Sequence, residues 1–73
     1  MIVFLDKQDF EKVLHGNRSI HINDKVIVGH VYTFMCNDTY YSYPVDAKIK
    51  SYYPAGDVYK TNKAIRTSNF PFK

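Results

Sequence analysis

The segment from residue 41 to residue 49 alternates between apolar and polar side chains, and this period of two constrains the fold more than any other feature. Its odd positions are Tyr41, Tyr43, Val45, Ala47 and Ile49, and its even positions are Ser42, Pro44, Asp46 and Lys48. Successive side chains of a strand point to opposite faces of a sheet. We therefore predict a half-buried strand with a buried odd face and a solvated even face. Because Pro44 cannot donate a backbone hydrogen bond, we predict that this strand lies at the edge of its sheet or is bulged at Pro44.

The size and composition of the chain restrict its class. A length of 73 residues allows one domain, 1–73, and the 45% of hydrophobic residues suffices for one packed core. The lone cysteine, Cys36, excludes an internal disulfide framework, and we expect it to be a buried small hydrophobe. One cysteine with three scattered histidines also argues against a structural zinc site, so we expect no metal and no cofactor.

Hydropathy argues against a membrane partner. No stretch approaches the roughly 20 apolar residues that a transmembrane helix needs. The apolar start, Met1 to Leu5, reaches an acid at Asp6 and has no basic region before it, so we do not interpret it as a signal peptide. We expect a small cytoplasmic domain.

The first half of the chain predicts one helix and several short strands. Residues 2–5 form an apolar run that is too short for a helix and predict a strand. Residues 7–15 predict a helix with Asp6 as the N-cap and Gly16 as the left-handed residue after its end. The buried face of this helix consists of Phe10, Val13 and Leu14. In residues 18–23, Ile20 and Ile22 alternate with polar residues, as in a half-buried strand.

Further strands follow. Residues 26–28 form a short apolar stretch, and residues 31–36 are rich in β-branched and aromatic side chains, which predicts a central strand. Asn37-Asp38 predicts a hairpin connection, and residues 58–60 begin another strand. Together these elements predict an α+β fold, a small curled antiparallel sheet or partial β-barrel with one N-terminal helix that plugs an open end.

The C-terminal part, residues 61–73, lacks a clear period. Phe70 and Phe72 flank Pro71, and the segment fits a last short strand as well as a flexible tail that becomes ordered on a partner. A core of this size is marginal, so a homodimer or another partner would stabilise it.

The run from Phe10 to Asp24, followed by Val28 to Tyr32, resembles the ASCH domain, a branch of the PUA-like superfamily. The helix with its terminal Gly16, the Arg18-Ser19 pair, the Ile20/Ile22 strand and Gly29 stand at the spacing of that family. The resemblance covers roughly residues 1–50 and leaves the C-terminal part unmatched. It implies a reduced PUA-like fold.

The same resemblance argues against catalysis. Some members of the family are small amidohydrolases that act on acetylated cytidine, with a lysine after the helix, a threonine on the next strand and a distant glutamate. In this chain Arg18 stands at the lysine position, His21 stands at the threonine position, and Glu11 is the only glutamate. An arginine side chain cannot be deprotonated in a protein, so it cannot replace a lysine base. We therefore expect a binding module and not an enzyme.

Two surfaces are candidates for binding. In PUA-like domains the surface near the helix end holds RNA or a nucleotide, and position by position this implicates Arg18, Ser19, His21 and Asn23. Arg18 would pair with a phosphate and Asn23 would contact a base edge. The alternative roles are structural: Arg18 caps the helix carbonyls, His21 is a satisfied strand histidine and Asn23 forms a turn.

The second surface follows from the charge. Residues 1–36 are neutral, and the whole net charge of +3 lies in residues 37–73, which favours a polyanionic partner. Aromatic and basic residues interleave there: Tyr40, Lys48, Lys50, Tyr52, Tyr53, Tyr59, Lys60, Lys63 and Arg66. Exposed aromatic rings stack on unpaired bases while cations hold phosphates. In the alternative, these tyrosines are a rim of the core and the lysines protect an edge strand.

Two functional hypotheses follow. The first is a module that binds RNA or another nucleic acid, with an affinity that falls steeply with salt. The second is a phage-type interaction protein that binds and inhibits a host enzyme or defence protein. An abundance of residues with AT-rich codons (Lys, Asn, Ile, Tyr and Phe) and the small size suit the second. The lopsided charge and the family resemblance favour the first.

Overall fold

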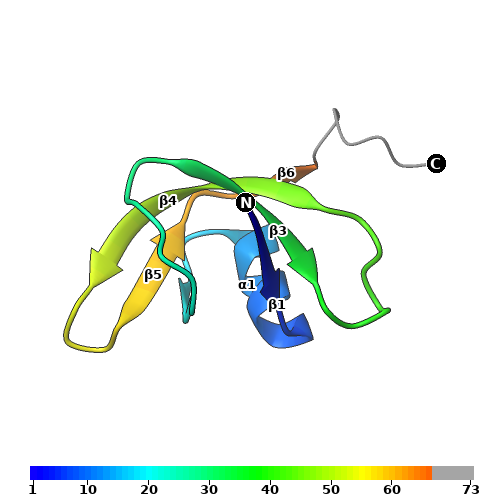
Figure 1. The fold of residues 1–73 in the computed structure, drawn as a ribbon, viewed down its shortest axis with the longest axis horizontal. Coiled ribbons are helices and arrows are strands. Elements are labelled where there is room, and N and C mark those ends of the chain that lie inside the picture. Colours follow the sequence, from blue (N-terminus) through cyan, green and yellow to red (C-terminus); the bar gives the residue numbers. More distant parts are fainter. Residues whose placement is uncertain (67–73) are drawn as a thin grey trace.

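A computed structural model of the protein describes residues 1–66, and residues 67–73 lie outside the described part. The elements are β1 (Ile2–Leu5), α1 (Lys7–His15), β2 (Ser19–Ile20), β3 (Val31–Cys36), β4 (Val45–Tyr53), β5 (Val58–Thr61) and β6 (Ile65–Arg66). The strands form one open sheet in the order β1-β3-β4-β5-β2, and β6 pairs with β4. The sheet arches over the helix (Figure 1). The predicted α+β class is confirmed, with a curled sheet that does not close.

The strand β4 organises this sheet. Its first half pairs with β3 on one side and with β6 on the other. Its second half pairs with β5, and the register shifts between Ile49 and Ser51. Because one strand serves both halves, the sheet bends around β4 and leaves a concave side for the helix (Figure 1).

One strand pair departs from the predicted antiparallel sheet. β1 and β3 are parallel, with Val3 opposite Phe34. A parallel pair requires a connection that returns the chain to the same end of the sheet, and the segment that contains α1 and β2 provides it. The remaining pairs are antiparallel, so the sheet is mixed.

The alternating segment forms β4, but the strand begins later than predicted. Within β4, Val45, Ala47 and Ile49 are buried and Lys48 is exposed, which confirms the assignment of the two faces there. Before β4 the assignment is wrong for Pro44, which is buried, and Tyr41 and Tyr43 are only half-buried. The prediction of an edge strand or a bulge at Pro44 is wrong, because Pro44 lies just before the first residue of β4 and is itself buried. No hydrogen bond between β4 and its neighbours therefore requires an N–H from Pro44, and β4 has neighbours on both sides.

The helix has the predicted bounds. Asp6 caps it, with its Oδ1 accepting a hydrogen bond of 2.8 Å from the backbone N–H of Asp9. Phe10 and Val13 are fully buried. Gly16 has the predicted positive φ of 80°, but its ψ of 158° is extended and not left-handed helical. The chain therefore leaves the helix directly toward β2.

The strand predicted over residues 18–23 is shorter in the structure, since only Ser19 and Ile20 pair with β5. Ile20 and Ile22 are nevertheless buried between exposed neighbours, as the alternation predicted. Residues 26–28 form no strand. Ile27 and Val28 are exposed, and the next residue, Gly29, donates its N–H to the Ile49 carbonyl at 2.8 Å.

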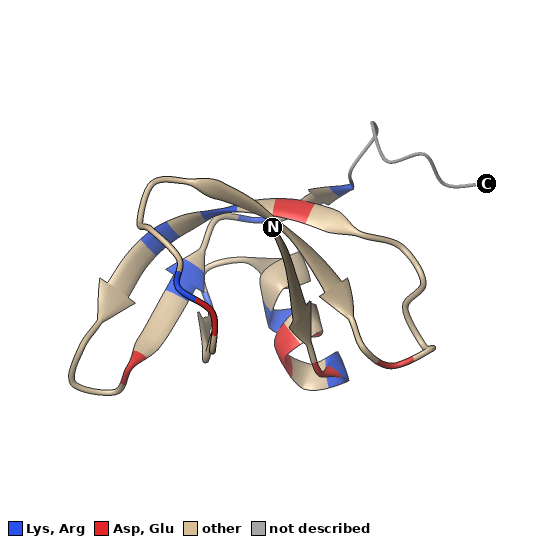
Figure 2. Cartoon of the chain, viewed as in Figure 1, with Lys and Arg blue, Asp and Glu red and all other residues tan. Residues whose placement is uncertain are grey.

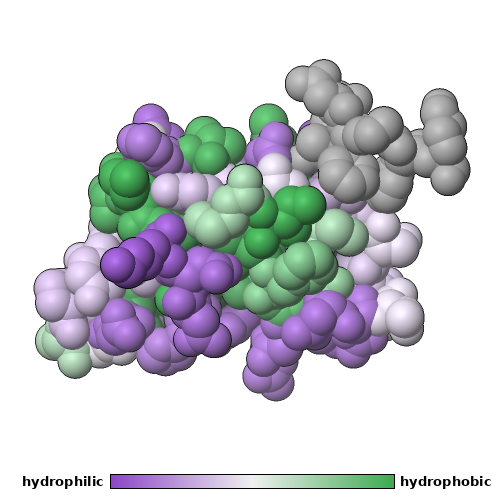
Figure 3. Space-filling model, in the orientation of Figure 1, coloured by the Kyte–Doolittle hydropathy of each residue, from purple (hydrophilic) through white to green (hydrophobic). Residues whose placement is uncertain are grey.

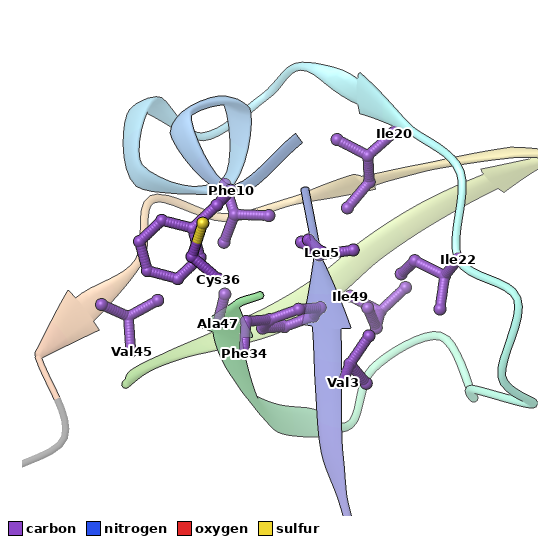
Figure 4. Close-up of a cluster of buried hydrophobic side chains, with 11 residues drawn as sticks. Val3, Leu5, Phe10, Ile20, Ile22, Phe34, Cys36, Val45, Ala47 and Ile49 are labelled. Atoms are coloured by element: carbon purple, nitrogen blue, oxygen red, sulfur yellow. The ribbon is translucent and has the colours of Figure 1, made fainter. Parts of the chain in front are cut away.

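The core lies between the concave side of the sheet and α1 (Figure 4). Its buried residues are Val3, Leu5, Phe10, Val13, Ile20, Ile22, Phe34, Cys36, Val45, Ala47 and Ile49. Cys36 is 6% exposed, which confirms that it is a buried small hydrophobe. Within residues 1–66 no helix is long and apolar enough to cross a bilayer.

The segment that was predicted as a last strand or a tail begins inside the sheet. Thr61 is buried at the end of β5, and Ile65–Arg66 forms β6. Phe70, Pro71 and Phe72 lie outside the described residues.

Candidate nucleic-acid interface

The outer face of β4 and β5 follows from the residues that these strands bury. Ile49 and its neighbour across the ladder, Thr61, both point into the core. Since side chains alternate along a strand, Lys48 and Lys60 point to the opposite, outer face. Ser19 and Ser51 stand directly opposite Lys60 on the two flanking strands and share its face.

Lys50 lies at the register shift of β4 and is held across the sheet. Its Nζ donates a hydrogen bond of 2.7 Å to Oδ1 of Asn17. Asn17 lies on the far side of β5, where its N–H donates to the Thr61 carbonyl at 2.7 Å. The Lys50 side chain therefore spans β5.

Lys48 and Lys63 meet at a shallow depression. It has a volume of about 210 Å³, and its lining residues are Val31, Asp46, Ala47, Lys48, Asn62, Lys63 and Ile65. Asn62 joins this rim to β4, because its N–H donates to the Lys48 carbonyl at 3.0 Å. The carboxylate of Asp46 accepts a hydrogen bond of 2.7 Å from the Thr33 hydroxyl.

Tyr53 lies at the hairpin end of the same outer face. The Lys60 Nζ is 5.3 Å from the centre of its ring. A hydrogen bond with Ser51, followed in importance by the positive charge of Lys60, lowers the pKa of the Tyr53 hydroxyl. Tyr53 is 46% exposed, so its side chain is accessible to a ligand.

We call Lys48, Lys50, Lys60 and Lys63 the lysine strip. Lys and Arg residues gather along β4 and β5 in Figure 2. The one ion pair between residues 1 and 66 joins Lys12 with Asp9, so in this part of the chain no carboxylate oxygen lies within 4.0 Å of a lysine-strip ammonium. The strip lysines therefore have no ion-pair partner among residues 1–66, and Asp46 lines the same depression as Lys48 and Lys63.

Tyr52 and Tyr59 occupy the other face of the hairpin. Their ring centres are 4.7 Å apart, and Tyr59 stands opposite the buried Ile20. The Tyr52 hydroxyl donates to Oδ1 of Asp57 at 3.0 Å, and this hydrogen bond, with burial next in importance, raises the pKa of Tyr52. His21 Nδ1 lies 3.2 Å from the Asp57 carbonyl oxygen. These residues tie the hairpin to the segment after β2.

The first predicted surface is divided by the sheet. Arg18 shares a hollow of about 380 Å³ with residues of α1, namely Gln8, Glu11, Lys12 and His15. Ser19, the next residue, belongs to the outer face beside Lys60. Asn23 is exposed in the loop before β3. Arg18, Ser19, His21 and Asn23 therefore do not line one common cleft.

Two members of the second predicted surface also lie elsewhere. The Arg66 guanidinium stacks over the Tyr43 ring at 4.0 Å, next to the first residue of β4. Tyr40 lies before β4, where the Lys7 Nζ is 4.0 Å from its ring centre. Neither reaches the hairpin at the other end of β4.

Asn17 is a site residue that sequence reasoning missed. Its position after Gly16 indicates a turn, and its φ of 59° fits one. Its partner, Lys50, is 33 residues away in sequence, and no local pattern reveals this contact.

Comparison with known protein families, with curated proteins and with solved structures finds no match for this chain. The resemblance to the ASCH domain stays a prediction. In residues 1–66 no group of three or more His, Cys, Asp or Glu residues is arranged to hold a metal ion.

Proposed function

We propose that this protein is a non-catalytic module that binds single-stranded RNA along the lysine strip. The observation that carries the proposal is the gathering of four lysines on one outer face, from β4, from β5 and from the segment after β5, with no ion-pair partner among residues 1–66. Such a surface attracts a polyanion, and binding releases the counterions that the polyanion carries.

Each group on this face has a role in the proposed complex. The ammonium groups of the lysine strip neutralise phosphates, and the serine hydroxyls of Ser19 and Ser51 donate to phosphate or ribose oxygens. The exposed ring of Tyr53 stacks on an unpaired base. Stacking of this kind needs a base free of its partner, which favours a single strand over a duplex.

The preference for RNA and the finer fold rest on the resemblance to ASCH and PUA-like domains. We propose a reduced member of that superfamily. The order β1-α1-β2, the positive φ of Gly16 and Gly29, and the open curled sheet support this proposal. Of the residues that the resemblance implicates, Ser19 lies on the proposed binding face opposite Lys60, whereas Arg18 lies beside α1.

A titration of labelled mixed-sequence single-stranded RNA, followed by fluorescence anisotropy at several salt concentrations, tests the proposal. We compare the wild-type protein with the triple variant Lys48→Met/Lys50→Met/Lys60→Met. The matched control, Lys7→Met/Lys12→Met/Lys25→Met, removes the same charge from outside the strip. Each phosphate contact on a single strand contributes about 0.7 to the slope of log K against log salt. We expect the strip variant to lower this slope by about 2 and the control to leave it nearly unchanged.

Two single variants divide the surface further. Tyr53→Leu should weaken binding by roughly tenfold, the effect of one lost stacking contact, without changing the salt slope. Arg18→Ala should have a smaller effect than any lysine of the strip, since Arg18 lies on the helix side.

Equal losses in the strip variant and the control would contradict a localised site. Failure of the wild-type protein to bind at low salt would contradict the proposal as a whole. The alternative hypothesis, a phage-type protein that inhibits a host enzyme or defence protein, would then be the one to test.

A further inference from the structure

Among residues 1–66, the strand β1 forms an edge of the sheet that no other strand covers. Its one neighbour among the described strands is β3, and it stands at the end of the strand order. The Leu5 carbonyl, on the β3 side, accepts a hydrogen bond from the Asn37 N–H at 2.9 Å. Backbone groups of successive residues point to opposite edges of a strand. The N–H and C=O groups of Ile2 and Phe4 therefore point away from β3, toward the open edge.

This edge lacks the features that usually prevent strand pairing. Residues 1–5 contain no proline, no glycine and no charged side chain. At the other end of the sheet, β2 has only two residues. The chain is basic, but its lysine strip lies on β4, β5 and the segment after them. Two copies that approach each other at β1 therefore avoid the repulsion between like charges that they would meet at the lysine strip.

Apolar side chains also surround this edge. Met1 is 62% exposed, Ile2 41% and Phe4 59%. Figure 3 shows a hydrophobic area in the middle of this view of the molecule, where β1 lies in Figure 1. Ile2 and Phe4 lie on the outer face, because Val3 and Leu5 point into the core.

We propose that β1 pairs antiparallel with β1 of a second copy, about a two-fold axis at Val3. In this register Ile2 of each copy stands opposite Phe4 of the other. The Ile2 N–H of each copy donates to the Phe4 carbonyl of the other copy, and the Phe4 N–H donates to the Ile2 carbonyl. Every N–H and C=O group that Ile2 and Phe4 point toward the edge is then hydrogen-bonded in both copies.

Other registers fit less well. A shift by one residue would place outer side chains opposite inner ones, which a sheet with one buried face does not allow. A shift by two residues would place Phe4 opposite Phe4 and Ile2 opposite Asp6, which has left the strand to cap α1. The register centred on Val3 is therefore the one that matches both the faces and the hydrogen-bonding groups.

The available area predicts a weak dimer. A large apolar residue presents about 200 Å² when fully exposed, so Met1, Ile2 and Phe4 of two copies expose roughly 650 Å² in total. Stable specific interfaces bury about 1,200–2,000 Å². We therefore expect a weak dimer, and the concentrations that test it run from about 10 µM to about 1 mM.

Sedimentation equilibrium of the full chain over this concentration range tests the proposal in the absence of nucleic acid. We expect the average mass to rise toward that of a dimer, and we expect Phe4→Lys to abolish the rise. The control, Ile65→Lys, makes the same change at a side chain that is 69% exposed on β6, and it should still dimerise. A monomer at every concentration, or a dimer insensitive to Phe4→Lys, would overturn the proposal.

Disulfide trapping tests the register. An oxidised mixture of the Ile2→Cys and Phe4→Cys proteins should form a cross-linked dimer, because opposite residues of a hydrogen-bonded pair are about 5.5 Å apart at Cα. Phe4→Cys alone should cross-link much less. The native Cys36 is buried, and the wild-type protein measures its background. Efficient cross-linking of Phe4→Cys alone would contradict the register centred on Val3.

Discussion

Lys50 and Asn17 form a bridge across β5, with the lysine Nζ 2.7 Å from the asparagine Oδ1. The bridge joins the bulge in the central strand to the turn that follows α1. Asn17 is fixed at its backbone as well, by its hydrogen bond to the Thr61 carbonyl. A surface lysine is normally mobile because ordering its side chain costs up to about 2 kcal/mol of entropy. The hydrogen bond to Asn17 offsets part of that cost and holds one cation of the lysine strip in place.

Asn17 adopts a φ of 59°, so replacements at this position separate the backbone requirement from the side-chain bridge. Asn17→Gly removes the bridge but accepts the positive φ. Asn17→Ala removes the bridge and adds about 1–2 kcal/mol of left-handed strain. We expect the alanine variant to be the less stable of the two by about 1 kcal/mol in urea unfolding. Equal stabilities would show that the positive φ is not required at Asn17.

Gly16 and Gly29 both have positive φ, but their surroundings differ. A Cβ on Gly16 would lie 2.6 Å from the backbone N and Cα of Lys63, whereas a Cβ on Gly29 would meet no atom within 4 Å. We expect Gly16→Ala to destabilise the protein by about 3 kcal/mol, because strain and a clash with backbone add. Gly29→Ala should cost about 1 kcal/mol, from strain alone. Thermal or urea unfolding of the pair measures the difference, and a reversed order would contradict this account.

Thr61 is 1% exposed, and its hydroxyl has no hydrogen-bond partner within the described residues. A buried polar group without a partner costs about 1–3 kcal/mol. Thr61→Val keeps the shape of the side chain, so we expect it to stabilise the fold by about 1 kcal/mol. Thr33→Val is the matched control, and we expect it to destabilise the fold, because it removes a hydroxyl that donates to Asp46 at 2.7 Å. Destabilisation by Thr61→Val would indicate that this hydroxyl has a partner in solution.

Because of Tyr41, the stability of the fold should change with pH in the alkaline range. Its hydroxyl donates to Oε2 of Glu11 at 2.8 Å, and this hydrogen bond, followed by burial and by the charge of Glu11, raises its pKa from 10.0 to about 12. A hydroxyl with a raised pKa stabilises the folded state below the unfolded pKa, and this contribution is lost as the pH rises through the folded value. We expect Tyr41→Phe to reduce the loss of stability between about pH 10 and pH 12. Urea unfolding at several pH values checks this, and an identical pH profile in the variant would contradict it.

Local patterns predicted those parts of the structure that depend on neighbouring residues. The capping aspartate Asp6 and the apolar spacing of Phe10 and Val13 predicted α1 with its observed bounds. The alternation in residues 41–49 predicted which side chains of β4 are buried. The prediction that β4 is an edge strand is wrong. The strand begins at Val45, one residue after Pro44, so the missing N–H of Pro44 does not restrict its pairing.

The candidate site was predicted in part. Lys48, Lys50, Lys60 and Lys63 were among the proposed residues, since the charge asymmetry indicates the second half of the chain. The sequence also grouped Arg18 with Ser19, and the structure places Arg18 beside α1 and Ser19 beside Lys60. β2 begins only at Ser19, which shares the face of its partner Lys60, so adjacency in sequence does not give Arg18 and Ser19 a common surface.

By itself the sequence determined the helix, the approximate strands, the buried faces and the location of the net charge, because each depends on residues close together along the chain. Only the tertiary structure decided that β4 is central, that β1 lies parallel to β3 at the end of the strand order, and that Asn17 meets Lys50. Strand order depends on backbone hydrogen bonds between segments remote in sequence, and such bonds are nearly independent of side-chain identity. The lysine strip is a product of that pairing, which brings β4 and β5 together on one outer face.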